Sequence, residues 1–131
     1  MSGNNGTLSA AEKEDLKSRI KKSGELLVAL GNETRLKMLC AMVDSSCEGI
    51  RAAHLAEKCA LSRSTASIHL NILRKAGFIK VRREGTEIFY YIEPSEKKAG
   101  ELKELFSLIL EFTRRAPDRE GDELDGYKVR L

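Results

Sequence analysis

The sequence predicts a mainly α-helical fold with one small β-hairpin, in a single domain. Residues that commonly cap helices recur along the chain, and each is followed by apolar residues at helical spacing. In one segment only, residues 78–92, two β-prone runs flank the turn signal Glu84-Gly85. A chain of 131 residues, 41% hydrophobic and 33% charged, fits one soluble globular domain.

Two helices are expected in the first thirty residues. Ser9 and Glu12 have the spacing of a capping box, which predicts a helix that starts near Ala10. This helix is highly charged and has only a thin apolar line. Gly24 should interrupt it, and residues 25–30 form a second, short helix.

A third helix should follow Asn32, whose side chain is a good N-cap. Its expected buried stripe has the spacing i, i+3, i+4, i+7 and consists of Leu36, Leu39, Cys40 and Val43. Residues 44–49 then read as a loop.

Two further helices are separated only by a short turn. The first covers roughly 50–59, with Ala52, Leu55, Ala56 and Cys59 on its buried side. The second runs from about Arg63 to Ala76, with Ser62 as its N-cap and Gly77 as the residue that stops it. Helical spacing places Ala66, Leu70, Leu73 and Gly77 on the side that faces the core, with His69 at its edge.

The hairpin and one long helix complete the chain. Residues 78–83 and 86–92 are the expected strands, and a helix covers about 95–115. Its apolar band is wider than one core face requires; it contains Leu102, Leu105, Phe106, Leu108, Ile109, Leu110 and Phe112.

Helix, short turn, helix and basic hairpin form the order of a winged helix-turn-helix, whose second helix enters the DNA major groove. Short hydroxyl side chains at the head of that helix allow close approach to DNA and bond phosphates and bases. The expected DNA-binding residues of the helix are Arg63, Ser64, Thr65, Ser67, Ile68, Asn71, Arg74 and Lys75. Those of the hairpin, or wing, are Arg82, Arg83 and Thr86.

The charge distribution favours the same partner. The net charge is only +3, but residues 61–83 contain six basic residues and no acid. A local positive field on a nearly neutral body is typical of a protein that binds a polyanion, although a solvated basic face is the simpler alternative. Double-stranded DNA is therefore the expected partner.

The segments LVALGNETRLKML and HLAEKCALSRSTASIHLNILRKAGFIKVRREGTEIFYYI resemble the ArsR/SmtB family of winged-helix repressors. The resemblance runs from about Gly24 to Phe112. The matched positions are Arg35, Leu55-Ala56, Leu61-Ser62, Ser64-Thr65, Ser67, His69-Leu70, Leu73, Ala76-Gly77, Arg83, Gly85 and Tyr90.

The resemblance implies a homodimeric repressor that binds an inverted repeat and releases it when an effector binds. In the family the first and last helices form the dimer interface, which would explain the wide apolar band. The chain is then a winged helix-turn-helix domain at 9–115, with the helix-turn-helix at about 50–76, the wing at 78–92 and a dimerisation helix at 95–115. Residues 1–8 are an expected disordered tail, and residues 116–131 a flexible one.

Ile68 departs from the family pattern, which often has a basic or polar residue there. It is either a tolerated exposed side chain or a contact for a thymine methyl group.

The metal sites of the family lack their ligands here. Arg51 and Ala53 stand where metal-sensing members often carry Cys-X-Cys, and residues 95–115 contain no Asp, His or Cys. Cys40 matches one of two reactive cysteines in a redox- and persulfide-sensing branch, but core packing is the favoured reading. Cys59 is expected to be buried, and Cys47 exposed in a loop.

No cofactor is therefore certain. The possible effectors are those that a thiol binds, namely an arsenite-like species, a soft metal or a reactive sulfur species, with Cys40, Cys47 and Cys59 as candidates. His54 is expected to be a surface residue. The alternative function is a constitutive dimeric winged-helix module that binds DNA or protein without an effector.

Enzymatic activity is not expected, since the chain has no Gly-rich phosphate loop, no HExxH and no apolar pair of carboxylates.

The N-terminus has no signal-peptide pattern, and no apolar run approaches the ~20 residues of a membrane span. Three cysteines without close pairing indicate reduced thiols and a cytoplasmic location.

Overall fold

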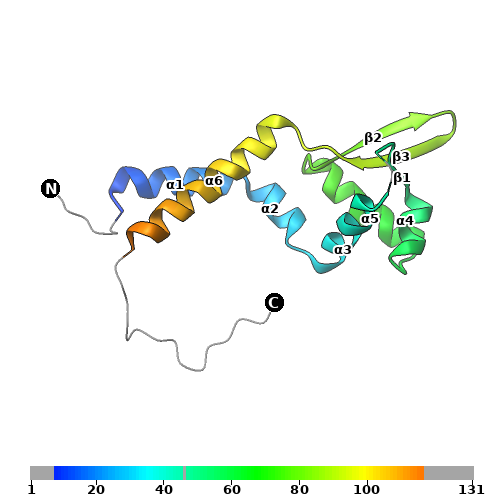
Figure 1. Ribbon diagram of the computed structural model, residues 1–131, viewed down its shortest axis with the longest axis horizontal. Helices are drawn as coiled ribbons and strands as arrows, with labels where there is room; N and C mark the ends of the chain where they lie inside the picture. The colour runs from blue at the N-terminus through cyan, green and yellow to red at the C-terminus, as the bar shows by residue number, and fades with distance from the viewer. Residues whose placement is uncertain (1–7, 46, 117–131) are drawn as a thin grey trace, which may run out of the picture.

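The computed structural model describes residues 8–45 and 47–116 and confirms the predicted fold class (Figure 1). In chain order the elements are α1 (Ala10–Lys22), α2 (Gly24–Leu30), α3 (Glu33–Val43), β1 (Ile50–Arg51), α4 (Ala52–Lys58), α5 (Arg63–Lys75), β2 (Ile79–Glu84), β3 (Glu87–Ile92) and α6 (Glu96–Arg115). Apart from Leu8 and Ala116, the two expected tails lie outside the described residues. None of the helices in the described ranges is long and apolar enough to cross a membrane.

Four side-chain caps fix where helices begin. The side chains of Ser9, Asn32, Ser62 and Ser95 each accept a hydrogen bond from the backbone N–H of the residue three positions on. Such a cap satisfies one of the N–H groups that a helix start leaves unpaired. At the other end of α5, Gly77 adopts a positive φ of 84°, as expected for the residue that stops a helix.

The sheet has one strand more than the sequence predicted. Ile50–Arg51 (β1) pairs antiparallel with β3, so the strand order is β1, β3, β2. The predicted helix at 50–59 is therefore wrong at its start, because α4 begins at Ala52. A strand of two residues has no periodicity of its own, and here it depends on pairing with a partner about forty residues away.

The core lies between α2–α5 and the sheet. Met38, Leu55, Leu70 and Leu73 are fully buried at its centre. Ile79 of β2 and Ile50 of β1 close it from the side of the sheet. This packing presses the inner side of α5 against the body and leaves its outer side free.

The predicted buried stripe of α3 is wrong in three of its four positions. Leu36, Cys40 and Val43 are exposed, and only Leu39 is buried. The buried side of the helix instead contains Arg35, Met38, Leu39 and Met42. The buried side of α3 is thus shifted by one residue position from the predicted stripe. The reason is Arg35, which lies in the interior because α2 and α5 supply hydrogen-bond acceptors for its guanidinium.

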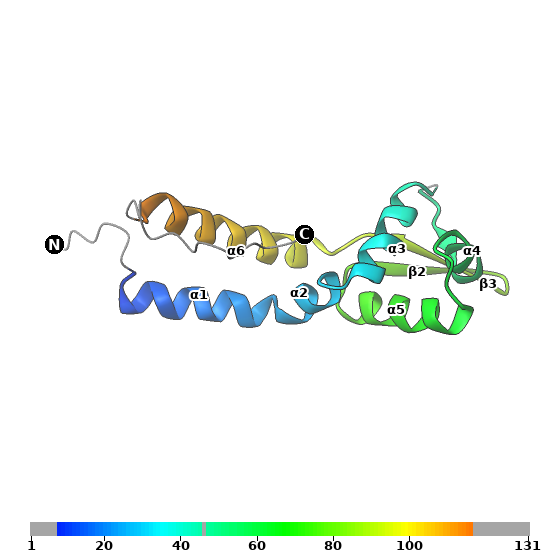
Figure 2. The same ribbon diagram turned by 90° about the horizontal axis from the view of Figure 1, so that it is seen from below.

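Helices α1 and α6 lie side by side and extend away from the rest of the molecule (Figure 2). A bidentate ion pair joins their far ends, with Arg115 Nη1 2.6 Å from Glu12 Oε2. The hydrogen bonds from Arg115, followed by that from the Ser9 N–H, lower the pKa of Glu12 to about 2. Only Leu105 is buried between these helices among their described residues, so much of the apolar surface of α6 stays open.

Candidate nucleic-acid interface

Helix α5 has one buried and one exposed side. Ala66, Leu70 and Leu73 are fully buried, which confirms the predicted inner side. The opposite side, here called the reading face, is exposed and consists of Ser64, Ser67, Ile68, Asn71 and Lys75. Arg63 and Arg74 flank it and are exposed, whereas Thr65 is half-buried.

The hydroxyl groups at the head of α5 divide into two sets. Ser62 Oγ accepts from the Thr65 N–H at 3.1 Å and donates to Thr65 Oγ1 at 2.9 Å, so these two residues hold the cap together. Ser64 Oγ lies 3.2 Å from Ser62 Oγ at the exposed rim of the cap. Ser64 and Ser67 therefore present hydroxyls outward at the end of the helix that a helix-turn-helix points at base edges.

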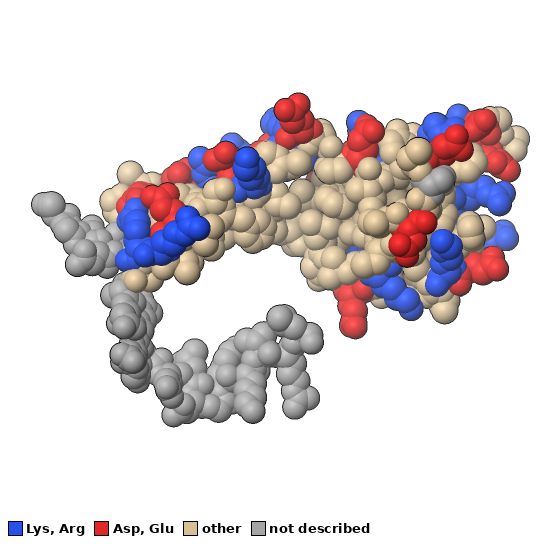
Figure 3. Space-filling model, viewed as in Figure 1, with Lys and Arg blue, Asp and Glu red and all other residues tan. Residues whose placement is uncertain are grey.

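The wing has less free positive charge than the sequence indicated. Lys80 Nζ lies 2.8 Å from Glu93, and Arg82 is paired with Glu84, so two basic residues of the acid-free window meet acids that follow it in the sequence. These hydrogen bonds raise the pKa of Lys80 and of Arg82. On the face shown in Figure 3, basic and acidic side chains are interspersed over this end of the molecule.

Arg82 also holds the wing to the loop before β1. Its Nη2 donates to the backbone carbonyl of Glu48 at 3.0 Å, and its guanidinium lies 4.6 Å from the ring centre of Phe89. By contrast, Arg83 and Thr86 are exposed near the hairpin tip. The three wing residues expected at DNA thus differ in how firmly the protein itself holds them.

A buried arginine connects α5 to two other helices. Arg35 Nη1 lies 3.1 Å from His69 Nδ1, while its Nε and Nη2 donate to the carbonyls of Ala29 and Val28 at the end of α2. Burial, and then the positive charge of Arg35, lower the pKa of His69. The sequence placed His69 at the edge of the inner side of α5 but indicated no partner for it.

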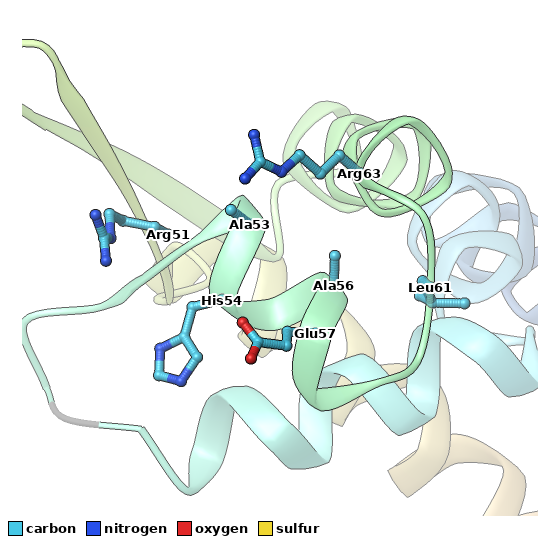
Figure 4. A pocket seen from close by; sticks show the side chains of 7 residues that line it. All are labelled: Arg51, Ala53, His54, Ala56, Glu57, Leu61 and Arg63. Atoms are coloured by element: carbon cyan, nitrogen blue, oxygen red, sulfur yellow. The ribbon is translucent and has the colours of Figure 1, made fainter.

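A pocket of about 620 Å³ lies beside the head of α5 (Figure 4). Its lining includes Arg51 and Ala53, the positions that the resemblance matches to metal-binding cysteines. Arg63 extends toward Ala53, and of the lining residues only His54 and Glu57 have side chains that bind metals. Within residues 8–45 and 47–116, no three His, Cys, Asp or Glu side chains come together as a metal site.

The three thiols lie in different settings. Cys59 is buried and Cys47 is exposed, as expected. Cys40 is exposed on α3, so its expected packing in the core is wrong. Cys47 also lines a pocket of about 450 Å³ with Met42 and Tyr91.

The central part of the chain matches a known family. Residues 32–81, which span α3 to the first part of the wing, match the sequence profile described as "Bacterial regulatory protein, arsR family". This range contains the whole reading face.

Individual relatives extend the similarity. The transcriptional activator HlyU of Vibrio cholerae is 33% identical over 86 residues, which are 66% of this chain and 77% of the relative. A biofilm growth-associated repressor of Xylella fastidiosa is 29% identical over 90 residues, covering 69% of this chain and 75% of the relative.

Solved structures give the same result for the fold. The structure of reduced HlyU from Vibrio cholerae aligns with a TM-score of 0.56 at 31% identity, covering 69% of this chain and 92% of that chain. A homodimeric winged helix-turn-helix DNA-binding domain from Mycobacterium bovis aligns with a TM-score of 0.51 at 26% identity, covering 87% and 94%. The architecture is thus that of winged helix-turn-helix regulators.

Proposed function

This chain belongs to the ArsR family of bacterial regulatory proteins, and we propose that it binds operator DNA as a homodimer through α5 and the wing. It is a transcription regulator and not an enzyme. The observation that carries the proposal is the contrast between the two sides of α5. Its inner side is fully buried, while Ser64, Ser67 and Asn71 present hydrogen-bonding groups outward between Arg63 and Lys75. Serine and asparagine bond base edges and phosphates, and arginine and lysine attract the DNA backbone.

The apolar surface of the two extended helices supports the dimer. Phe106, Ile109 and Leu110 of α6 are exposed, as is Ile20 of α1. Phe106, Ile109 and Leu110 have the spacing i, i+3, i+4 and therefore share one face of α6. An exposed apolar face of this kind is typical of a protein interface. A dimer would present two copies of α5 to two half-sites about one helical turn apart, which fits an inverted-repeat operator.

Regulation by a thiol-reactive or soft-metal effector is the second part of the proposal. Cys40 lies exposed on α3, five residues after Arg35, and Arg35 contacts His69 on α5. A modification of Cys40 that shifts α3 would move this contact and, with it, the reading face. The protein then acts as a repressor that its effector releases from DNA. The alternative is a constitutive winged-helix module without an effector.

Binding of the full-length protein to DNA upstream of its own gene, measured by fluorescence anisotropy at several salt concentrations, tests the first part. If ~6–10 phosphates are neutralised, affinity should fall by roughly 10³–10⁵ between 50 and 200 mM salt. Ser64→Ala and Ser67→Ala should alter sequence preference, by about 1–3 kcal/mol for each lost base contact. A salt-independent interaction would contradict the proposal.

Gel-shift titrations with arsenite, zinc, polysulfide and peroxide test the second part. At least one of arsenite, polysulfide and peroxide should release wild-type protein from DNA, whereas zinc should not. Cys40→Ser should bind DNA normally but resist release. Cys47→Ser and Cys59→Ser are the matched controls. Full release of Cys40→Ser would exclude Cys40, and a wild type that ignores every agent would favour the constitutive alternative.

A further inference from the structure

Ile68 is the one large apolar residue in the middle of the reading face. It is 61% exposed, and its neighbours one helical turn away on that face are Ser64 and Asn71. A single exposed apolar side chain needs no explanation in itself. Here, however, it lies in the centre of the surface that faces DNA in the proposed complex.

We infer that Ile68 recognises the 5-methyl group of a thymine in each operator half-site, an inference that rests on the proposed DNA-binding function. In the major groove the thymine methyl is the apolar group that distinguishes one base pair from another. An isoleucine cannot hydrogen-bond the donors and acceptors of the other base edges. Its branched side chain is also held in few rotamers in a helix, so little freedom is lost on contact.

The residues around Ile68 are suited to position it. Ser64 and Asn71 can bond base edges on either side, while Arg63 and Lys75 lie at the two ends of the reading face, where phosphates would pass. A methyl group opposite Ile68 would thus be enclosed between polar contacts. The contact between Ile68 and the methyl group is shielded from water only when the protein binds in the register that places the two opposite each other.

Ile72 provides a matched control within the same helix. It lies one turn beyond Ile68, is 36% exposed, and lines an apolar pocket of about 380 Å³ with Val28 and Ala29 of α2. Its side chain therefore has neighbours in its own protein, and it belongs to the half of α5 farther from the head of the helix. Substitution of Ile72 should not affect recognition of a methyl group.

The test uses full-length protein and a duplex selected from a random library. Each thymine of the selected half-sites is replaced in turn by deoxyuridine, which pairs identically but lacks the methyl group. Dissociation constants are then measured for the wild type, Ile68→Ala and Ile72→Ala on every duplex.

For the wild type, deoxyuridine at one symmetry-related thymine position should weaken binding roughly four-fold per half-site, or about sixteen-fold for both. Ile68→Ala should bind the thymine and deoxyuridine duplexes equally. Ile72→Ala should lose as much affinity on the deoxyuridine duplex as the wild type does. Thermal unfolding of Ile68→Ala should be unchanged or slightly higher, because alanine is the better helix former at an exposed position.

The inference fails if the wild type tolerates deoxyuridine at every position, or if Ile68→Ala remains sensitive to it. Either result leaves sequence-specific DNA binding intact. If instead the wild type selects no duplex at all, the proposed function itself fails. If Ile68→Ala binds every duplex like the wild type, Ile68 does not contact DNA.

Discussion

Arg35 Nη1 lies 3.1 Å from His69 Nδ1, and this contact joins the helix that carries Cys40 to the helix that carries the reading face. An arginine guanidinium can only donate hydrogen bonds, so His69 Nδ1 accepts and the imidazole is neutral, with its proton on Nε2. The same guanidinium donates to the last carbonyls of α2, which the helix leaves unpaired. One side chain thus fixes the relative positions of α2, α3 and α5.

Folding stability should therefore decrease in mild acid. Because the pKa of His69 is lowered in the folded protein, the unfolded chain binds more protons once the pH falls below about 6.5. Stability should be constant above that pH and fall as the pH drops through it toward the lower folded-state pKa. Urea unfolding at pH values from about 8 to 5 measures this slope.

Two glutamine variants test whether the pH dependence of folding stability comes from His69. His69→Gln keeps an acceptor for Arg35 but cannot titrate, so its stability should vary less over the same range. His54→Gln, at an exposed position, is the control and should retain the wild-type slope. An identical slope in wild type and His69→Gln would contradict the assignment.

The capped helix starts could be predicted from sequence, whereas the orientation of α3 could not. Ser9, Asn32, Ser62 and Ser95 act on residues three positions away, so the sequence alone contains the whole interaction. The buried side of α3 depends on Arg35, whose interior position is favourable only because α2 and α5 supply acceptors.

The candidate interface shows the same division between local and distant determinants. The two sides of α5 follow from helical spacing and were predicted correctly. The charge of the wing was overestimated for two reasons: Glu84, which pairs with Arg82, lies one residue beyond the window that was counted, and Glu93 approaches Lys80 only when the strands pair. The bond that holds Arg82 to the Glu48 carbonyl spans 34 residues. A short sequence window does not contain the two distant contacts.

Ala60→Gly should stabilise the fold. Ala60 adopts a positive φ of 55° in the turn between α4 and α5, where the Leu61 N–H donates to the Ala56 carbonyl at 2.8 Å. The left-handed conformation costs an L-residue roughly 1–2 kcal/mol, and glycine avoids this cost but loses more entropy on folding. A net gain of about 0.5–1 kcal/mol is expected in urea unfolding. Ala99→Gly, at an exposed position within α6, should instead lose up to ~1 kcal/mol; a loss in both variants would refute the prediction.

Phe106→Glu should convert the dimer to a monomer. Phe106 is 53% exposed in the isolated chain, next to Leu110 at 47%, and a charge there would be buried without a partner in the proposed interface. Sedimentation at micromolar concentration should show the change, and affinity for a two-half-site duplex should fall with it. Lys97→Glu, an exposed change on the same helix, should remain dimeric. Wild-type protein that sediments as a monomer would rule out the interface.

Arg82 and Arg83 should differ in effect although they are neighbours on the wing. Arg83 is exposed, so Arg83→Ala should leave stability within ~0.5 kcal/mol of the wild type and weaken binding to all duplexes alike. If one phosphate contact is lost per half-site, the slope of log K against log salt concentration should become shallower by about 0.9 for each lost contact.

Arg82→Ala should also destabilise the fold and lower the urea midpoint of unfolding, because it removes the hydrogen bond to Glu48 and the contact with the Phe89 ring. Arg82→Lys separates the two roles, since it keeps the charge but not the planar donor geometry. If Arg82 mainly holds the wing to the loop, Arg82→Lys should be nearly as unstable as Arg82→Ala. Wild-type stability combined with weakened DNA binding in Arg82→Ala would instead identify Arg82 as a phosphate contact like Arg83.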